Sequence, residues 1–517
     1  MNLRKIAPIF LLAILSSTST IIAQQFHVEK SDVFDESGGG WNQILQLKNG
    51  NTFLLHMEDK GGIDVAVYDK SRKIVSQKNI TGNLWNASDV VDRWLYEING
   101  EPVLFLNLED HYQRTLVRLR LNPSDGGMIK EEVVATAGAV KSSPVEIGFI
   151  DVKKDPASDC YVVIAETLRN VEGKIKVTHY DGENKKLSEA DYKGGGPGGF
   201  RYTKYSSVLV DGNKGVYLVL TGFVEKPSYA RELPPRLVGD SKIVVAKLNA
   251  GEKIFLNKTM NINVDLSDEI ASQMLFNRKN NQLELRTKSL SESKTRRLTG
   301  TVTHYYLSLI MYIDPETINL ISAKAVDGQK VNEYGQTHID KDYEFNGIPN
   351  KMVINKDNTT TIIMEKTASM EGKSFLSDIG VSIFSDTCAE ISGYAIKKLQ
   401  QETHGVDNAQ FMSYDYISTS KGNYILFNDA VSNINKGEDE SKRRKVSAVS
   451  LTNSVGYKLS NNTIEKVFFF GEPTDNSSTF GYTAGTDYNE GTNTYATVIV
   501  ERNGRKKEAR LAWVTFN

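Results

Sequence analysis

The chain has 517 residues, more than one ordinary domain needs, because most domains contain about 100 to 200 residues. Its 62 Lys and Arg residues nearly balance 64 Asp and Glu residues. The chain therefore lacks the large positive charge of nucleic-acid binders and polybasic membrane-surface proteins, which argues against both classes. Two cysteines exclude a disulfide scaffold, a zinc-cluster module and a CxxC redox pair. The 39% of hydrophobic residues, with 23 Tyr and 20 Phe, exclude a disordered chain and can fill a large core.

Residues 1–23 have the order of a secretory signal peptide. Arg4 and Lys5 form a basic start, residues 6 to 15 are apolar, and cleavage is expected after Ala23. The apolar run is too short to span a bilayer, and no later window approaches about 18 consecutive apolar residues. We therefore expect an exported protein without a transmembrane segment, located in the periplasm, at the outer envelope or outside the cell. Residues 24–517 would form a single domain.

From residue 26 onward, apolar and polar residues alternate with a period of two, which is typical of β-strands. No stretch of 11 to 18 residues shows the apolar periodicity of an amphipathic helix, so we expect an all-β protein. An apolar strand, a polar turn and a very apolar strand recur eight times, at a mean interval of about 63 residues. The eight turns contain Gly50, Gly100, Pro156, Gly212, Asn281, Asn358, Gly422 and Gly491.

A second hairpin follows the first in seven of these units, so each unit predicts a four-stranded antiparallel sheet. Such a sheet cannot bury both faces alone, which is typical of a propeller blade. The eighth unit lacks one strand, while residues 26–34 supply a spare strand before the first unit. We predict an eight-bladed β-propeller whose ring is closed by the N-terminal strand joining the last blade. Seven blades are the alternative, because the fifth and sixth units are irregular.

This pattern resembles the β-propeller superfamily in general. The sequence contains no WD40, kelch, YWTD, Asp-box or quinoprotein motif, so the resemblance points to no particular family. It implies a rigid scaffold with a central channel and two faces, and a fold alone does not give a function.

One predicted face carries nearly all the long connections between strands. Long loops are commonly retained where binding occurs, so we expect this face, over blades four to seven, to be the working one. Neutral drift in tolerant loops is the alternative. The long segments are 193–202, 223–242, 288–304, 327–348, 366–377, 400–410, 430–445 and 471–480.

Three loops on this face carry basic residues, the first of them rich in proline. Guanidinium groups suit carboxylates, sulfates and phosphates, so the loops predict an acidic protein partner or an anionic envelope glycan. Ordinary solvated charges are the alternative. The candidate binding residues are Tyr229, Arg231, Arg236, Arg296, Arg297, Arg443 and Arg444.

The first residues of each innermost strand line the mouth of a propeller channel, where ligands often bind. Their mixed charges suit a polar ligand or a water-filled channel. A pair such as Asp92 and Glu146, if about 5 to 10 Å apart, would serve as the acid and base of a polysaccharide hydrolase or lyase. The candidates at the mouth are Asp92, Arg93, Glu146, Lys204, Lys351 and Tyr414.

The segment 337–346 alternates His338, Asp340, Asp342 and Glu344. In an extended strand these side chains would project to one side and could bind a divalent cation. The segment lacks the glycine and closing glutamate that a calcium loop has at set spacing. No motif indicates a cofactor, and we expect none.

Three further features bear on phosphate binding, acid–base chemistry and the state of the cysteines. The glycine-rich run at 193–200 lacks the Lys-Ser/Thr and helix of a phosphate-binding loop, which favours a simple crossing between blades. His111 follows two acidic residues and is a candidate for acid–base work. Cys160 and Cys388 fall on different blades, which predicts two free thiols, one of them buried.

These observations favour a non-enzymatic binding or scaffold propeller that presents its long-loop face to a protein partner or an envelope glycan. The alternative is a polysaccharide hydrolase or lyase with carboxylates at the channel mouth. The balanced charge argues against nucleic acid as a partner. Nothing in the sequence indicates an oligomeric state.

Overall fold

The computed structural model describes most of the chain after residue 25. The described residues are 26–35, 40–58, 61–110, 113–138, 148–167, 174–193, 200, 202–224, 241–262, 270–295, 302–370, 373–403, 409–435, 443–447, 452–460, 462–474, 477–504 and 506–517. The expected signal peptide lies outside these ranges.

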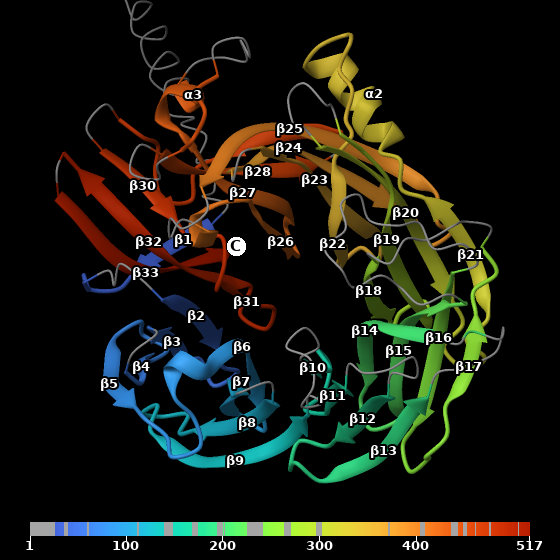
Figure 1. Cartoon of the computed structure of the whole chain (residues 1–517). Coiled ribbons are helices and arrows are strands. Elements are labelled where there is room, and N and C mark those ends of the chain that lie inside the picture. The colour runs from blue at the N-terminus through green and yellow to red at the C-terminus, as the bar shows by residue number, and fades with distance from the viewer. Residues whose placement is uncertain are drawn as a thin grey trace, which may run out of the picture.

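The described strands form eight antiparallel sheets that follow one another around a ring (Figure 1). Blade 1 contains β2 (Trp41–Gln46), β3 (Thr52–Met57), β4 (Ile63–Tyr68) and β5 (Ile74–Ile80). Blade 2 contains β6 (Val90–Ile98), β7 (Glu101–Asp110), β8 (Gln113–Leu121) and β9 (Met128–Ala137). Blade 3 contains β10 (Phe149–Lys154), β11 (Tyr161–Thr167), β12 (Lys174–Tyr180) and β13 (Lys186–Lys193). Blade 4 contains β14 (Tyr202–Asp211), β15 (Gly215–Phe223), β16 (Lys242–Asn249) and β17 (Leu256–Thr259).

The second half of the ring repeats this arrangement. Blade 5 contains β18 (Ile270–Asn277), β19 (Gln282–Thr295), β20 (Val302–Ile313) and β21 (Leu320–Ala325). Blade 6 contains β22 (Ile348–Ile354), β23 (Thr360–Met370), β24 (Lys373–Phe384) and β25 (Glu390–Thr403). Blade 7 contains β26 (Asp415–Thr419), β27 (Gly422–Ala430), β28 (Thr452–Ser460) and β29 (Thr463–Val467). The protein is an eight-bladed β-propeller, as predicted, and the seven-bladed alternative is wrong.

Blade 8 contains strands from both ends of the described chain. β30 (Ser477–Gly481) and β31 (Asp487–Asn489) pair with β32 (Thr494–Asn503), which pairs with β33 (Lys506–Phe516). The outermost strand is β1 (Phe26–Lys30), which pairs antiparallel with β33 from Phe26 opposite Phe516 to Lys30 opposite Ala512.

The hydrophobic core of the described residues lies between the blades rather than within them. Each of eight clusters of buried apolar side chains joins at least two neighbouring sheets. Between blades 2 and 3, for example, Val103 and Phe105 pack with Ile150 and Tyr161. Each sheet therefore depends on both neighbours to cover its apolar faces.

Tight turns join the first and second strands of most blades. At the tip of the β6–β7 hairpin, Asn99 has a φ of 53° and Gly100 a φ of 75°. Two consecutive residues with positive φ are typical of the type I′ turn, whose twist matches that of the flanking strands. The Asn99-Gly100 pair thus fixes the β6–β7 hairpin and its register.

Several of the expected long loops are regular structure instead. The segment 327–348 includes a helix, α2 (Gln329–His338), although helices were not expected. Most of 366–377 belongs to β23 and β24, and 288–295 belongs to β19. Extended β-pairing satisfies backbone N–H and C=O groups that an irregular loop would expose, which favours strands of 11 to 14 residues here.

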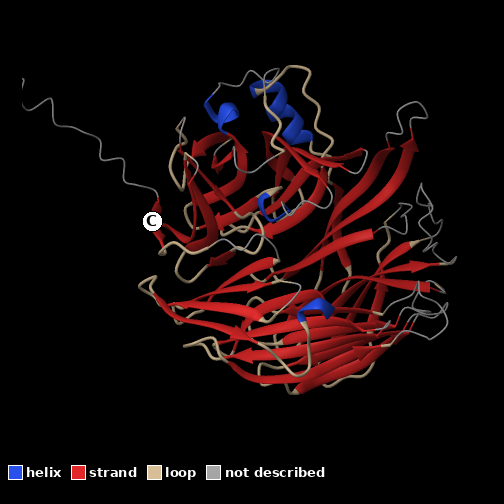
Figure 2. Ribbon diagram, turned by 60° about the vertical axis from the view of Figure 1, so that its left-hand side comes forward, coloured by secondary structure: helices blue, strands red, loops and turns tan. Residues whose placement is uncertain are grey.

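Two shorter helical elements lie in other connections. These are η1 (Ala87–Asp89) before β6 and η2 (Ala409–Phe411) before β26. A five-residue helix, α3 (Val431–Asn435), follows β27. α2 and α3 lie at the same side of the molecule (Figure 2). None of the described helices is long and apolar enough to cross a membrane.

Both cysteines are free thiols, in line with the expectation. Cys160 precedes β11, and Cys388 lies in the turn between β24 and β25. The expectation that only one is buried is wrong, because both side chains are covered by the packing between blades.

Candidate functional site at the channel mouth

The strands nearest the ring centre are β2, β6, β10, β14, β18, β22, β26 and β31 (Figure 1). Where the inner strands of blades 1 to 4 begin, charged and aromatic side chains gather. We call this group the mouth cluster; it consists of Trp41, Asp92, Arg93, Phe149, Asp151, Lys204 and Tyr205 near the start of these strands, together with Tyr96 farther along β6 and Glu166 of β11.

Arg93 and Trp41 join blades 2 and 1 at the mouth. The guanidinium carbon of Arg93 lies 4.1 Å from the centre of the Trp41 ring, a cation–π contact. The neighbouring side chain of Asp92 is exposed and accepts a hydrogen bond of 2.8 Å from the backbone N–H of Arg93. Burial lowers the pKa of Arg93 to about 10, and the charge of Asp92 opposes this shift. The two charges and the ring form one polar and aromatic surface.

Blades 3 and 4 meet through a tyrosine and a carboxylate. The Tyr205 hydroxyl donates a hydrogen bond of 2.6 Å to Asp151 Oδ2, and the Tyr205 ring lies 5.6 Å from the ring of Phe149. Phe149 remains 39% exposed. Burial raises the pKa of Asp151, and the nearby charge of Asp92 also raises it. This electrostatic link connects the blade 2 and blade 3 parts of the cluster.

Glu166 is a nearly inaccessible carboxyl group beside this contact. It stands opposite Phe149 in the β10–β11 pairing and is 5% exposed. Burial raises the pKa of Glu166 to about 7, and the charge of Lys204 opposes that rise. A carboxyl group with such a pKa can hold or release a proton at neutral pH.

A β-bulge shapes the β14 side of the cluster. The pairing of β14 with β15 shifts between Tyr205 and Ser207, so Ser206 is the extra residue. A bulge changes the direction of the following side chains and increases the local twist. It lies directly beside Lys204 and Tyr205, the two residues that blade 4 contributes.

The remaining predicted mouth residues form a separate group on blades 6 and 7. Lys351 Nζ lies 3.3 Å from Asp415 Oδ1, and Asp415 Oδ2 accepts a hydrogen bond of 2.6 Å from Thr486. The Tyr414 hydroxyl donates to Asn350 Oδ1. These bonds join inner strands of neighbouring blades, so this group contributes to the packing of the ring.

The predicted basic loops fall largely outside the described residues. This applies to Tyr229, Arg231, Arg236, Arg296 and Arg297, and also to Glu146 and His111. The structure therefore does not test the expected distance between Asp92 and Glu146.

The third basic loop lies partly within the described residues. Arg443 Nη2 lies 2.7 Å from Asp429 Oδ2, and Asp429 is 2% exposed. Arg444 is exposed, and its backbone N–H donates to Asn433 Oδ1 over 2.6 Å. The guanidinium of Arg443 is thus used within the fold to neutralise a buried carboxylate.

The extended conformation expected for the metal candidates is wrong. His338 ends α2, and its Nδ1 lies 3.0 Å from the Tyr334 carbonyl oxygen, while its ring stacks on Tyr334. Asp340 and Asp342 follow in a turn, where Asp340 Oδ1 accepts the Asp342 N–H. Among the residues that the structure describes, no group of three or more His, Cys, Asp or Glu side chains could hold a metal ion.

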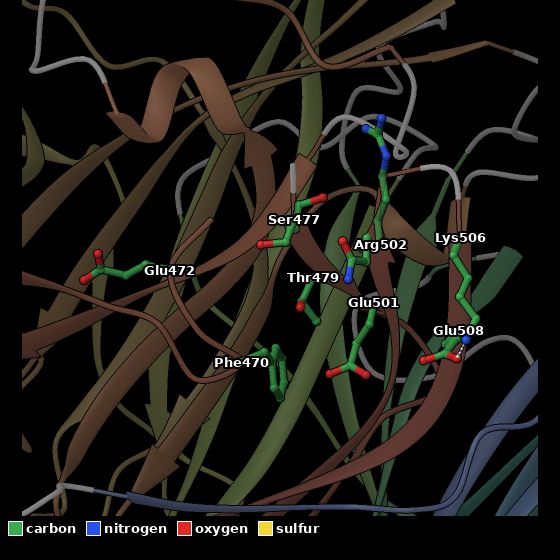
Figure 3. A pocket seen from close by; sticks show the side chains of 10 residues that line it. Phe470, Glu472, Ser477, Thr479, Glu501, Arg502, Lys506 and Glu508 are labelled. Carbon is green, nitrogen blue, oxygen red and sulfur yellow. Dashed lines mark ion pairs between the residues drawn. The ribbon is translucent and has the colours of Figure 1, made fainter. Parts of the chain in front are cut away.

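A polar pocket of about 310 Å³ lies at the edge of blade 8 (Figure 3). Three of its charged residues, Glu501, Lys506 and Glu508, belong to a ladder of ion pairs. Glu501 Oε1 lies 2.6 Å from Lys30 Nζ, and Glu501 Oε2 lies 2.8 Å from Arg510 Nε. Glu508 pairs with Lys506 and lies 3.5 Å from Arg510. Because the ladder joins β1, β33 and β32, it stabilises the blade and offers few carboxylates to a ligand.

Sequence reasoning identified Asp92, Arg93 and Lys204 but missed Asp151 and Glu166. Glu166 interrupts the otherwise apolar run of β11, and a lone carboxylate in such a strand is a signal of a buried polar group.

No family model matches the sequence, and no curated protein matches it. Among solved structures, the polysaccharide lyase Uly1 is 10% identical over 94% of this chain and 92% of that chain, with a TM-score of 0.39. The WD40 domain of SCAP from fission yeast is 9% identical over 97% of both chains, with a TM-score of 0.35. A prolyl endopeptidase is 10% identical with a TM-score of 0.39, and the match spans 90% of this chain and 55% of the endopeptidase. These likenesses give no information on function.

Proposed function

We propose that the protein is an exported, non-enzymatic propeller that binds an envelope glycan at the mouth cluster. The observation that carries the proposal is the combination, at the start of the inner strands, of an exposed Phe149 ring, an Arg93–Trp41 stack and an exposed Asp92 carboxylate. A protein segment as ligand is the alternative outcome of the test below.

The chemistry of these side chains suits a sugar chain. Aromatic rings provide apolar surface against which the C–H face of a sugar can pack, and carboxylates accept hydrogen bonds from its hydroxyl groups. Arg93 adds a donor for a carboxylate or sulfate on the glycan. The internal hydrogen bond between Tyr205 and Asp151 restrains both side chains before binding, so little of their conformational entropy would be lost on binding.

The experiment is isothermal titration of the purified chain with fragments of envelope polysaccharide. We expect Arg93→Ala to weaken binding by at least about tenfold, since hydrogen bonds to charged groups contribute about 1.5 to 3 kcal/mol. The matched control is Arg72→Ala. Arg72 also stacks on a tryptophan, Trp513, at 5.0 Å, but it lies in the β4–β5 turn on the opposite face.

The control should leave binding unchanged. Equal losses in the two variants would show that the mouth cluster is not the site. Binding of envelope protein instead of glycan, lost in Arg93→Ala alone, would keep the site and change the ligand.

A polysaccharide hydrolase or lyase is the second candidate function, favoured by Glu166. Its pKa of about 7 suits a residue that donates and accepts a proton at neutral pH. Glu166→Gln should then abolish release of reducing or unsaturated ends from the polysaccharide while glycan binding persists. If the wild-type chain releases no such ends, the enzymatic candidate is excluded and the binding function stands.

A further inference from the structure

A second pocket, of about 470 Å³, lies beside blade 1. Its wall is one face of the blade, from β2 across to β5, and its rim includes Phe34 and Asp35 of the segment that follows β1. We call it the blade-1 pocket. A volume of this size is within the range of small-ligand sites, and it could hold one or two sugar rings.

A row of polar side chains crosses the blade in this pocket, one from each strand. Asn42 stands opposite His56, His56 opposite Asp64, and Asp64 opposite Asn79. His56 Nδ1 lies 3.1 Å from Asn42 Oδ1, and Asn79 donates a hydrogen bond of 2.8 Å to Asp64 Oδ1. Neighbouring strands are about 4.8 Å apart, so the row presents donors and acceptors at regular intervals.

Apolar side chains form the floor directly behind this row. Leu54 stands opposite Ala66 in the next register position, and Tyr68 follows on the same strand. Leu54 and Tyr68 are 8% and 4% exposed, and the Tyr68 ring packs against Trp513 of blade 8. Leu54, Ala66 and Tyr68 thus form an apolar floor, and Phe34 on the rim adds a second aromatic ring.

The rim is predominantly acidic. The carboxylates of Asp35, Glu58 and Asp64 line the pocket. The cationic Lys78 is held 2.5 Å from Asp125, and His56 Nε2 lies 3.5 Å from Glu58. Among the described residues that line the pocket, three carboxylates against one paired lysine and one histidine favour a ligand with positive charge and disfavour a uronate or sulfate.

We propose that the blade-1 pocket binds an amino sugar, with the ring on the apolar floor. The hydroxyl groups would bond to the Asn42–Asn79 row, and the protonated amine would lie against Asp64 and Glu58. None of these residues belongs to the mouth cluster. The pocket is therefore a second site that goes beyond the proposed function and can stand or fall independently of it.

The test is saturation-transfer NMR and titration calorimetry of the full chain with glucosamine, glucose and glucuronic acid, up to about 10 mM. We expect glucosamine to bind more tightly than glucose, and glucuronic acid to bind most weakly. Asp64→Asn and Glu58→Gln should each weaken glucosamine binding by about tenfold. Both changes are nearly isosteric, and Glu58 is 56% exposed, so folding should persist.

Arg93→Ala is the control, because it alters the mouth cluster alone and should leave glucosamine binding unchanged. The proposal is overturned if the wild-type chain does not bind glucosamine in this range, or if glucuronic acid binds as tightly. Unchanged affinity in both carboxylate variants would also overturn it.

Discussion

Buried carboxyl groups at junctions between blades make stability depend on pH. Burial raises the pKa of Glu166 to about 7 and the pKa of Asp487 to about 6. Asp487 Oδ2 accepts the Gln46 N–H over 2.7 Å and so joins blade 8 to blade 1. Both carboxyl groups bind a proton more tightly in the folded state than in the unfolded state. Their contribution to the free energy of unfolding is therefore lost as the pH rises from the unfolded pKa, near 4, to the folded pKa.

Glu166→Gln should remove the part of this dependence that belongs to Glu166. Above pH 7 the variant should be more stable than wild type by up to about 3 kcal/mol, since one pKa unit corresponds to about 1.4 kcal/mol. Near pH 4 the two proteins should be equally stable. Urea denaturation at several pH values measures this difference. A stability difference between variant and wild type that stays constant across the pH range would contradict the raised pKa of the buried Glu166.

A buried ion pair in blade 6 gives a second prediction at the residue scale. Lys398 and Glu365 are joined by a hydrogen bond, and their side chains are 0% and 3% exposed. Burial lowers the pKa of Lys398, and Glu365 opposes that shift. Ser413 also donates to Glu365 Oε2 over 2.9 Å. The two charges depend on each other because both side chains are buried away from solvent.

Lys398→Met should destabilise the protein by about 3 to 5 kcal/mol, because it leaves the Glu365 charge buried and unpaired. Adding Glu365→Leu should restore much of the lost stability, since an apolar pair of similar volume leaves no buried charge without a partner. Chemical denaturation of the single and double variants measures both effects. A single variant as stable as wild type would contradict the pairing.

At the scale of elements, the sequence predicted the hairpins well and the connections poorly. Asn-Gly turns and alternating apolar residues determine strands such as β6 and β7, because both signals are local. The extensions of β23 and β24 are polar, as at Lys366 and Ser377, so their sequence resembles a loop. α2 was missed because it shows little apolar periodicity; among its residues only Val331 and Gly335 are buried.

The same limit applies to the candidate site. Asp92, Arg93 and Lys204 could be named because each lies near the start of an inner strand. Asp151 and Glu166 join them through packing between blades 3 and 4, which depends on tertiary register rather than on local pattern.

The ion-pair ladder of blade 8 gives a prediction at this scale. Glu501 and Glu508 stand directly opposite each other on β32 and β33, and Arg510 contacts both. Arg510 Nη1 also donates to the Ser31 carbonyl oxygen over 2.9 Å, next to β1. Like charges that face each other on neighbouring strands repel, so Arg510 offsets the repulsion between Glu501 and Glu508.

Arg510→Gln should lower stability by no more than about 1 kcal/mol, because these side chains are partly exposed and screened by water. Its main effect should be faster hydrogen exchange in β1, measured by mass spectrometry. Arg120→Gln, which breaks a comparable pair with Glu101 in blade 2, is the control and should leave β1 unaffected. Equal exchange in the two variants would argue against a role for the ladder in holding β1.

At the scale of the whole molecule, every core cluster of the described residues is shared between neighbouring blades, which implies cooperative unfolding. Trp513 illustrates this: it is fully buried, its Nε1 donates to Thr52 of blade 1 over 3.0 Å, and its ring meets Tyr68. A blade that lost its neighbour would expose apolar surface on one face. The ring should therefore unfold as one unit rather than blade by blade.

Trp513→Ala should lower stability by about 3 to 5 kcal/mol through the cavity it leaves. Calorimetry should still show a single transition at a lower temperature. Two separated transitions would indicate that part of the ring folds independently.

The central claim is that ligand binding occurs at the mouth cluster. Hydrogen exchange of the wild-type chain, with and without envelope polysaccharide fragments, tests it most directly. We predict that the ligand slows exchange at the first residues of β6, β10 and β14, and that Arg93→Ala removes this protection. Protection confined to the opposite face, around the turns at Gly50, Gly100 and Gly212, would contradict the claim.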